Sequence, residues 1–363
     1  MKTKFSYILI CILISACSPK SMQYTNVVEF DYAHDTLRFD ELFSIEKSIH
    51  LEAKDGSLVT TITKMEIYDN KFFVLDANQN KLLVFNDDGT FNCHIGNQGN
   101  GSGEYYQIND FSINKENKQI AILSYPSYVF VYDIDGNFAY KKELAECALW
   151  HIKWLGGTYL CTTDQRSYLE GQDDCHPYYF YDTEFNLICK TGESLSESVA
   201  IPSFISNPIQ CDSIRIVYFD CFKPAIDIIS QGHPESIDNS YFLKISDIPE
   251  YSETFYDMNK LTDVSNLKFF IEAYCNYEQV IGSISMGGNV FAYKIDLPNL
   301  RGTLYPISFP YPSLLCTEER MLYTAISVDD SISTKYYTHG IPLTTRFTKD
   351  NNFIILKLCP KNP

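Results

Sequence analysis

The sequence predicts an all-β fold, a β-propeller made of four-stranded antiparallel blades. The first observation is an internal repeat: a strand-like run at 71–76 recurs at 118–123, and the turn glycine Gly89 recurs as Gly136, both at an offset of 47 residues. A repeat of about 40–50 residues built from short strands is typical of propeller blades. The second observation is the composition, because 27 Tyr and 24 Phe against 2 Trp favour half-buried strands.

The charge balance restricts the class of partner. The 363-residue chain is 45% apolar and 21% charged, a globular composition, and its formal net charge is −17. A surface of this sign repels phosphate backbones, so we expect no nucleic-acid partner. The acidic excess serves solubility, and the functional alternative is attraction of cations or of neutral, hydroxyl-rich ligands.

Residues 1–16 are predicted to be a lipoprotein signal peptide. Two lysines precede an apolar run at 5–14 that is too short to span a bilayer as a helix. The segment ends Ile14-Ser15-Ala16-Cys17. This ending resembles the bacterial lipobox, which implies that Cys17 is acylated and begins the mature protein, with residues 17–34 as a tether. The alternative is an ordinary cleaved signal peptide in which Cys17 has no role.

The predicted location follows from this terminus. No later stretch has 18 uninterrupted apolar residues, so no other membrane crossing is predicted. No acidic cluster follows Cys17, whereas similar lipoproteins that reach the cell surface often have one. We therefore expect an outer-membrane lipoprotein on the periplasmic side.

Residues 35–363 are predicted to form a single propeller domain. An alternating stretch at 48–52 precedes the first blade, and a propeller needs such a strand to complete its last blade without an exposed edge. Blade one is assigned to 63–68, 71–76, 81–86 and 90–96. The glycine-rich segment 95–105 leads into an alternating strand at 108–113 and not into a helix. It is therefore interpreted as an interblade crossover and not as a phosphate-binding loop.

A family resemblance becomes specific in this region. The residues that support it are Lys81-Leu82-Leu83-Val84-Phe85, Asp88-Gly89, Ile95-Gly96, Gly99, Gly101-Ser102-Gly103-Glu104-Tyr105 and Asp110-Phe111, with a similar last strand at 350–358. They resemble the bacterial six-bladed β-propeller lipoproteins, which are related to NHL-type repeats. The resemblance implies six blades, closed by the amino-terminal strand pairing in the last blade, and it supplies no catalytic residues. Ser102 departs from the family pattern, which usually has Pro there.

The remaining blades are assigned by continuity along the chain. The assignments are 147–154, 157–163, 178–182 and 187–191 for blade three, about 204–245 for blade four, about 267–304 for blade five, and 312–328 with 353–358 for blade six. The amino-terminal strand is expected to complete blade six. The stretch 247–263 is the one plausible helical excursion.

Ten cysteines remain after Cys11 and Cys17 are set aside, and export makes disulfides possible. Four of them are each 14 residues apart, namely Cys147, Cys161, Cys175 and Cys189. A metal site from Cys161, Cys175, His176 and Cys189 would lack the CxxC pair typical of structural zinc sites, so no metal and no cofactor are predicted. Buried free thiols are the main interpretation, and one or two disulfides are the alternative.

The sequence contains no G-x-S-x-G, H-E-x-x-H, C-x-x-C or Walker pattern. Asp110 precedes an inner strand whose end can face the central channel, and His151 and Glu272 are placed similarly. The polar loop 164–177 is longer than a tight hairpin, and long loops on a rigid scaffold often bind ligands. The predicted binding residues are Asp110, His151, Asp173, Asp174, His176 and Glu272.

The sequence favours binding over catalysis and specifies no reaction. We expect a monomeric, lipid-anchored binding or scaffold module that presents a propeller face to a glycan, a peptide or an envelope protein. A sensor or assembly factor for envelope complexes is a related hypothesis. The alternative is a hydrolase or lyase, similar to propeller lactonases and glycosidases, with its site at the central channel. A cluster of three or more carboxylates and histidines converging at one channel mouth would favour the enzyme, and an apolar, plugged channel would count against it.

Overall fold

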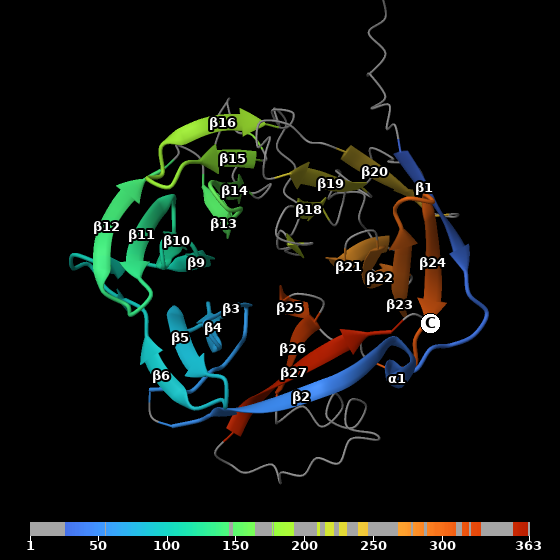
Figure 1. Ribbon diagram of the computed structural model, residues 1–363, viewed down its shortest axis with the longest axis horizontal. Helices are drawn as coiled ribbons and strands as arrows, with labels where there is room; N and C mark the ends of the chain where they lie inside the picture. The colour runs from blue at the N-terminus through green and yellow to red at the C-terminus, as the bar shows by residue number, and fades with distance from the viewer. Residues whose placement is uncertain are drawn as a thin grey trace, which may run out of the picture.

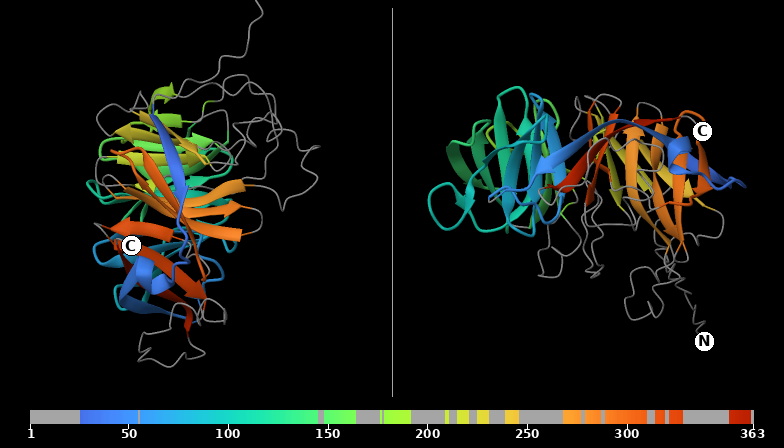
Figure 2. Two further views of the ribbon diagram at one scale, coloured as in Figure 1. Left: turned by 90° about the vertical axis from the view of Figure 1, so that its right-hand side faces the viewer. Right: turned by 90° about the horizontal axis from the view of Figure 1, so that it is seen from below.

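The chain forms a ring of blades around a central axis in the computed structural model (Figures 1 and 2). The residues that the structure describes are 26–54, 56–144, 148–163, 176, 178–191, 209–210, 215–220, 225–230, 239–245, 268–276, 279–286, 289–309, 314–318, 321–327 and 351–361. Within these residues the strands form four-stranded antiparallel blades, and one four-residue helix is present, α1 (Phe39–Leu42). The prediction of an all-β, six-bladed propeller is confirmed. The expected helical excursion at 247–263 lies outside the described residues.

Blades one to three are separate four-stranded sheets. Their strands are β3 (Lys64–Tyr68), β4 (Lys71–Asp76), β5 (Lys81–Asn86) and β6 (Phe91–His94), then β9 (Ile108–Asn114), β10 (Gln119–Ser124), β11 (Tyr128–Asp133) and β12 (Phe138–Glu143), then β13 (Leu149–Trp154), β14 (Tyr159–Thr163), β15 (Tyr178–Tyr181) and β16 (Leu187–Thr191). The first strand of each blade is innermost and the fourth is outermost (Figure 1). The strands predicted for blades one and three lie within two residues of these bounds.

Blades four to six complete the ring. Their strands are β17 (Ile209–Gln210), β18 (Arg215–Asp220), β19 (Ala225–Ser230) and β20 (Asn239–Lys244), then β21 (Lys268–Asn276), β22 (Gln279–Met286), β23 (Asn289–Asp296) and β24 (Arg301–Pro306), then β25 (Leu314–Glu318), β26 (Met321–Ser327), β27 (Asn351–Pro360) and β2 (Phe43–Glu52). In blade six, β2 pairs antiparallel with β27, and Phe43 lies opposite Pro360.

The core lies between neighbouring blades. A strand in the middle of a blade has another blade on each side, so both of its faces are buried and its sequence is a continuous apolar run instead of an alternating one. This explains why the four middle residues of β4 and of β5 are all buried. Phe73 of blade one packs with Phe111 and Phe130 of blade two, so each interface holds two consecutive blades together.

The glycine-rich segment between blades one and two is an interblade crossover, as predicted. Its two short strands, β7 (Asn97–Gln98) and β8 (Glu104–Tyr105), pair parallel and lead into β9. The Glu104 carboxylate accepts a hydrogen bond from the Gly101 N–H at 2.7 Å, and a Cβ on Gly99 would overlap it. The space over these glycines is thus filled by an anionic side chain of the protein itself, which disfavours a phosphate there.

The repeated turn glycines provide a matched pair for mutation. Gly89 (φ +88°) and Gly136 (φ +90°) both have backbone angles that disfavour other residues. A Cβ on Gly89 would overlap the His50 carbonyl of β2, whereas a Cβ on Gly136 would meet the Ile95 side chain at 3.2 Å. We expect Gly136→Ala to lower the free energy of unfolding by about 1–2 kcal/mol and Gly89→Ala by about 3 kcal/mol or more. Urea denaturation measures both, and equal losses would show that the β2 contact is unimportant.

One segment differs from the prediction. Residues 26–32, which were expected to belong to the tether, form β1 (Asn26–Tyr32), which pairs parallel with both β20 and β24 and joins blades four and five into one nine-stranded sheet. Val28 and Phe30 enter the core of these blades. The sequence signal is weak because only these two side chains of the strand are buried. Its partners also lie far away in the chain, since Glu29 and its partner Lys244 are 215 positions apart.

Candidate functional site

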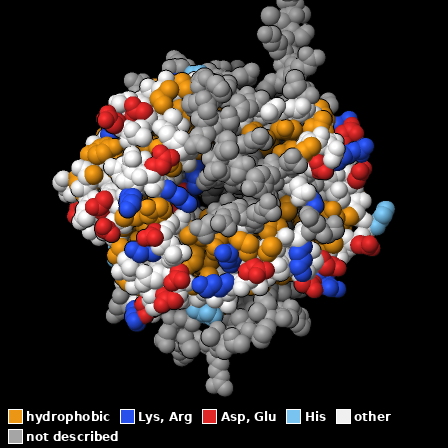
Figure 3. All heavy atoms as spheres, in the orientation of Figure 1, with side chains coloured by type: hydrophobic (Ala, Val, Ile, Leu, Met, Phe, Trp, Pro, Cys, Tyr) orange, Lys and Arg blue, Asp and Glu red, His pale blue; other side chains and the backbone are white. Residues whose placement is uncertain are grey.

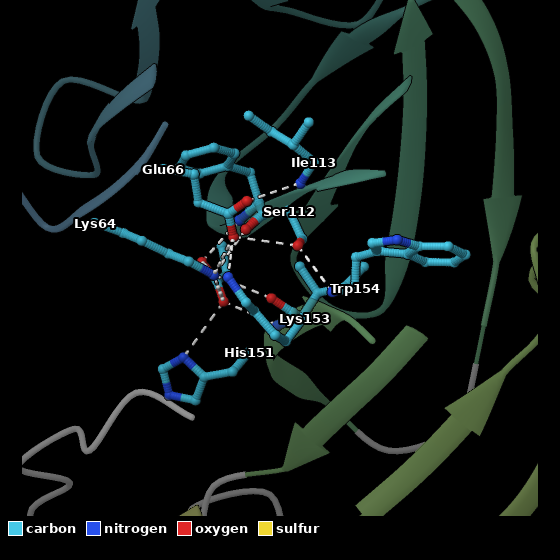
Figure 4. A network of polar contacts seen from close by, with 10 residues as sticks. Lys64, Glu66, Ser112, Ile113, His151, Lys153 and Trp154 are labelled. Atoms are coloured by element: carbon cyan, nitrogen blue, oxygen red, sulfur yellow. Dashed lines mark hydrogen bonds and ion pairs between the residues drawn. The ribbon is translucent and has the colours of Figure 1, made fainter. Parts of the chain in front are cut away.

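Two of the predicted site residues come together where the inner strands of blades one, two and three meet (Figure 4). Asp110 lies on β9 and His151 on β13, and the His151 Nδ1 is 3.6 Å from Asp110 Oδ2. The other predicted residues are not placed with them by the described structure: Glu272 lies on β21 of blade five, and His176 precedes β15. Cys17, Asp173 and Asp174 lie outside the described residues.

Lys64 connects the three inner strands. From β3 its ammonium reaches the Asp110 carboxylate at 2.8 Å and donates to the main-chain oxygens of Phe111 at 2.7 Å and Ile152 at 3.0 Å. Asp110 in turn accepts the Ile152 N–H at 2.9 Å. The Lys64 and Asp110 side chains are only 8% and 2% exposed. This ion pair is therefore buried, and it joins blade one to blades two and three.

Glu66, two residues further along β3, makes a second set of contacts. Its carboxylate accepts the Ile113 N–H at 3.0 Å, the Ser112 hydroxyl at 3.2 Å and the Lys153 ammonium at 2.8 Å. The Ser112 oxygen also accepts the Trp154 N–H at 2.9 Å. Lys64, Glu66, Asp110, Ser112, His151 and Lys153 thus form one cluster, called the channel network below.

The position of the channel network follows from the propeller's geometry. Each inner strand is the edge of its sheet, so some of its main-chain groups have no partner within the blade. Lys64 and Glu66 supply partners to blade two at Phe111 and Ile113, each 47 residues further along the chain. This is the repeat offset, so each side chain binds the main chain of its counterpart in the next blade.

The protonation state of the network is set by competing effects. Burial would raise the pKa of Glu66, but Lys153 and Lys64 outweigh it and hold that pKa below its ordinary value. Burial likewise opposes ionisation of Asp110, and Lys64 and His151 outweigh it, so the pKa of Asp110 is also lowered. Both carboxylates are therefore ionised at neutral pH and have no proton to donate to a substrate.

This arrangement is suited to holding blades together. Two carboxylates and a histidine do converge, as the enzyme hypothesis expected, but ammonium and main-chain donors engage both carboxylates. Sequence reasoning missed Lys64, Glu66 and Lys153. A signal for the first two existed, because β3 is a buried strand in which charged residues alternate with Met65 and Ile67.

Three aromatic side chains come from segments of blades two and three that adjoin β9, β10 and β13, and we call them the aromatic rim: Tyr106, Tyr125 and Trp150. Tyr106 directly follows β8 and is 68% exposed, and Tyr125 in the β10–β11 turn is 42% exposed. Trp150 on β13 is half-buried, with its ring 6.4 Å from that of Tyr125. No periodic pattern of the sequence predicts this cluster, because each ring comes from a different connection or strand end.

The described residues offer no metal site. Among them, no group of three or more His, Cys, Asp or Glu side chains could hold an ion. Cys161 has a free thiol that is fully buried, and desolvation raises its pKa well above the ordinary value. A thiol in this state packs as a small apolar group. Cys175, the next cysteine in the hypothetical metal set, lies outside the described residues.

The chain is similar to known proteins in sequence and in fold. A predicted exported protein from Bacteroides fragilis has a TM-score of 0.73 and 17% sequence identity, covering 93% of this chain and 100% of that chain. A DUF4221-family protein from Bacteroides vulgatus has a TM-score of 0.54 and 9% identity, covering 88% and 98%. These two structures show the likeness of fold alone. No curated protein has significant sequence similarity to the chain.

In the part of the chain that the structure describes, no helix has the length and hydropathy needed to cross a membrane.

The family assignment comes from the sequence. A family model for six-bladed β-propellers matches residues 18–279, which is well over half of the chain. The chain therefore belongs to the DUF5128 family of six-bladed β-propellers.

Proposed function

We propose that this protein is a lipid-anchored, extracytoplasmic binding module that uses the aromatic rim of blades two and three as its contact surface. The main support for this function is that the side chains of the channel network are largely buried and paired, whereas two side chains of the rim are exposed. The ionisable groups of the network are engaged with one another, whereas the Tyr106 and Tyr125 side chains are 68% and 42% exposed. Exposed aromatic groups on a rigid scaffold are typical of binding surfaces.

The proposed anchor is Cys17, on the periplasmic side of the outer membrane. Residues 18–25 separate it from β1 and reach at most about 30 Å when extended. Since β1 is fixed between β20 and β24, this short tether would keep that side of the ring near the bilayer. Blade two lies on the opposite side of the ring from β1 (Figure 1), so blade two would be the part of the ring farther from the anchor. The similar Bacteroides fragilis protein, which is predicted to be exported, supports the extracytoplasmic location.

The face shown in Figure 3 supports a partner that is not strongly charged. Acidic and basic side chains are interspersed over its described part, with apolar side chains between them. The whole chain has a net charge of −17, which disfavours polyanions. A glycan, a peptide or an envelope protein remains compatible with such a surface, and a hydrolase or lyase would need groups that the channel network keeps paired.

The proposal is tested by site-specific photocrosslinking in cells. A photoreactive residue placed at position 106 of the full-length chain is expected to form an adduct, and the same residue at Leu187, 47% exposed on the outer strand β16, is expected to form none. Cys17→Ser should remove palmitate labelling and weaken the adduct. Equal adducts from both positions, or no adduct from position 106, would show that the rim is not the contact surface.

A further inference from the structure

The rings of the aromatic rim are held together by main-chain contacts. The Tyr125 N–H donates to the Gln107 carbonyl oxygen at 3.1 Å, so the β10–β11 turn lies against the segment that contains Tyr106. The Leu149 N–H donates to the Pro126 oxygen at 3.3 Å, which places Trp150 beside the same turn. The three segments that carry the rings are therefore joined through their main chains, and the Tyr125 and Trp150 rings lie 6.4 Å apart. Tyr and Trp provide rigid, amphipathic contact area at a low cost in conformational entropy.

Asn109 follows Tyr106 by three residues, and its side chain contacts Leu149, the residue before Trp150. Its side-chain N–H donates to the Leu149 oxygen at 2.9 Å, which fixes the orientation of the amide. The other amide atom, Oδ1, is buried and has no hydrogen-bond partner in the structure. A buried unpaired acceptor is uncommon and costs free energy, so a hydroxyl donor that reached it would be favoured.

The charge beside the rim selects among ligands. Asp110 and Glu66 are paired with Lys64 and Lys153, so these four groups sum to no net charge. A site with flat aromatic faces, a hydroxyl acceptor and no net charge matches a ligand with apolar C–H faces and many hydroxyl groups. An anionic ligand would find no free cation among these four groups, and the acidic chain would repel it.

We propose that the aromatic rim binds neutral oligosaccharides, whose ring faces pack on Tyr106, Tyr125 and Trp150 and whose hydroxyl groups bind Asn109. This inference rests on the proposed function and names the ligand class for the same surface. A neutral sugar polymer fits this surface better than a polypeptide does, because the contact groups are flat rings and an amide acceptor and the charges of the channel network are already paired.

The tryptophan content allows a specific measurement. The chain has only two tryptophans, Trp150 in the rim and Trp154, which is buried against Tyr159 at a ring distance of 4.8 Å. A Trp154→Phe variant of the chain from Lys20 onward therefore reports on the rim alone. We expect maltohexaose, cellohexaose or xylohexaose to change Trp150 emission saturably and to protect it from acrylamide quenching.

Matched variants identify the contact residues. Tyr106→Ala and Tyr125→Ala in the Trp154→Phe background are each expected to weaken the response by about tenfold. Leu187→Ala, which removes a distant exposed side chain, should leave it unchanged, and Tyr106→Phe, which keeps the ring, should weaken it less than Tyr106→Ala does. Circular dichroism and thermal melting confirm that each variant is folded.

Three outcomes would overturn the inference. They are no response to any of the neutral hexasaccharides at millimolar concentration, a response only to polygalacturonate, and a response only to an unfolded polypeptide such as reduced, carboxymethylated lactalbumin. The last outcome together with a protein adduct at position 106 would leave the proposed function standing and reject the sugar ligand. No response together with no adduct would reject both.

Discussion

Replacing Lys64 with methionine is expected to lower the free energy of unfolding by about 3–5 kcal/mol. Methionine keeps an unbranched apolar stem but lacks the ammonium that binds Asp110 and the oxygens of Phe111 and Ile152. Asp110 would remain buried with fewer donors, and a buried charge that has lost its partner is far more costly than a broken surface pair. Urea denaturation of the chain from Lys20 onward measures this loss.

A surface ion pair provides the control for this variant. Arg38 and Asp40 lie 3.0 Å apart, but their side chains are 66% and 63% exposed. Arg38→Met should therefore change the free energy of unfolding by no more than about 0.5 kcal/mol. If Lys64→Met were no more destabilising than Arg38→Met, the channel network would not hold the blades together.

The network also predicts how stability depends on pH. The pKa values of Glu66 and Asp110 are lower in the folded chain than their ordinary values. Their contribution is complete above the ordinary values of about 4 and is lost as the pH falls towards the lowered folded values. We expect the free energy of unfolding to fall below about pH 5, and to fall less steeply in Lys64→Met. Parallel pH profiles for the two proteins would contradict this account.

Phe30→Ala is the second substitution with a large expected effect, about 3–5 kcal/mol. Phe30 is 5% exposed in the core of blades four and five, and its ring contacts Tyr293 edge-to-face at 6.3 Å. Loss of this anchor loosens β1, which also covers the edges of β20 and β24. We therefore expect both a lower denaturation midpoint and more aggregation, because exposed strand edges pair with other chains.

A double-mutant cycle tests the contact that holds β1. A Cβ on Gly302 would lie 2.5 Å from the Phe30 ring, so Gly302→Val alone should cost about 1–3 kcal/mol. In the Phe30→Ala background the valine fills the space that the ring has left, so the double variant should be more stable than the sum of the two losses by about 1 kcal/mol or more. Glu29→Ala, on the exposed face of β1, is the neutral control. Additive losses would show that Phe30 and Gly302 do not share this contact.

The sequence predicted the local part of the fold well. The offset between Gly89 and Gly136 located blades one and two, and the apolar runs located strands such as β4, because a strand between two blades is buried on both faces. These signals arise within about 50 residues of chain, where turn chemistry and hydrophobic patterning act together.

Long-range pairings were beyond such reasoning. β1 has two buried side chains, Val28 and Phe30, and its partners β20 and β24 lie more than 200 residues further along the chain. Asp110 and His151 were singled out, but their partner Lys64 was not. Which residues meet at the channel depends on how the inner strands of separate blades face one another, and spacing within one blade does not specify that.

We propose that the channel network stabilises the propeller and that the aromatic rim binds the ligand. The most direct test measures hexasaccharide affinity by Trp150 fluorescence in two folded variants of the Trp154→Phe chain. We predict that Lys64→Met, under conditions in which it is folded, keeps the affinity of the parent, and that the combined Tyr106→Ala and Tyr125→Ala variant loses it while melting at the parent's temperature. Loss of binding in Lys64→Met with binding retained in the tyrosine variant would contradict the claim.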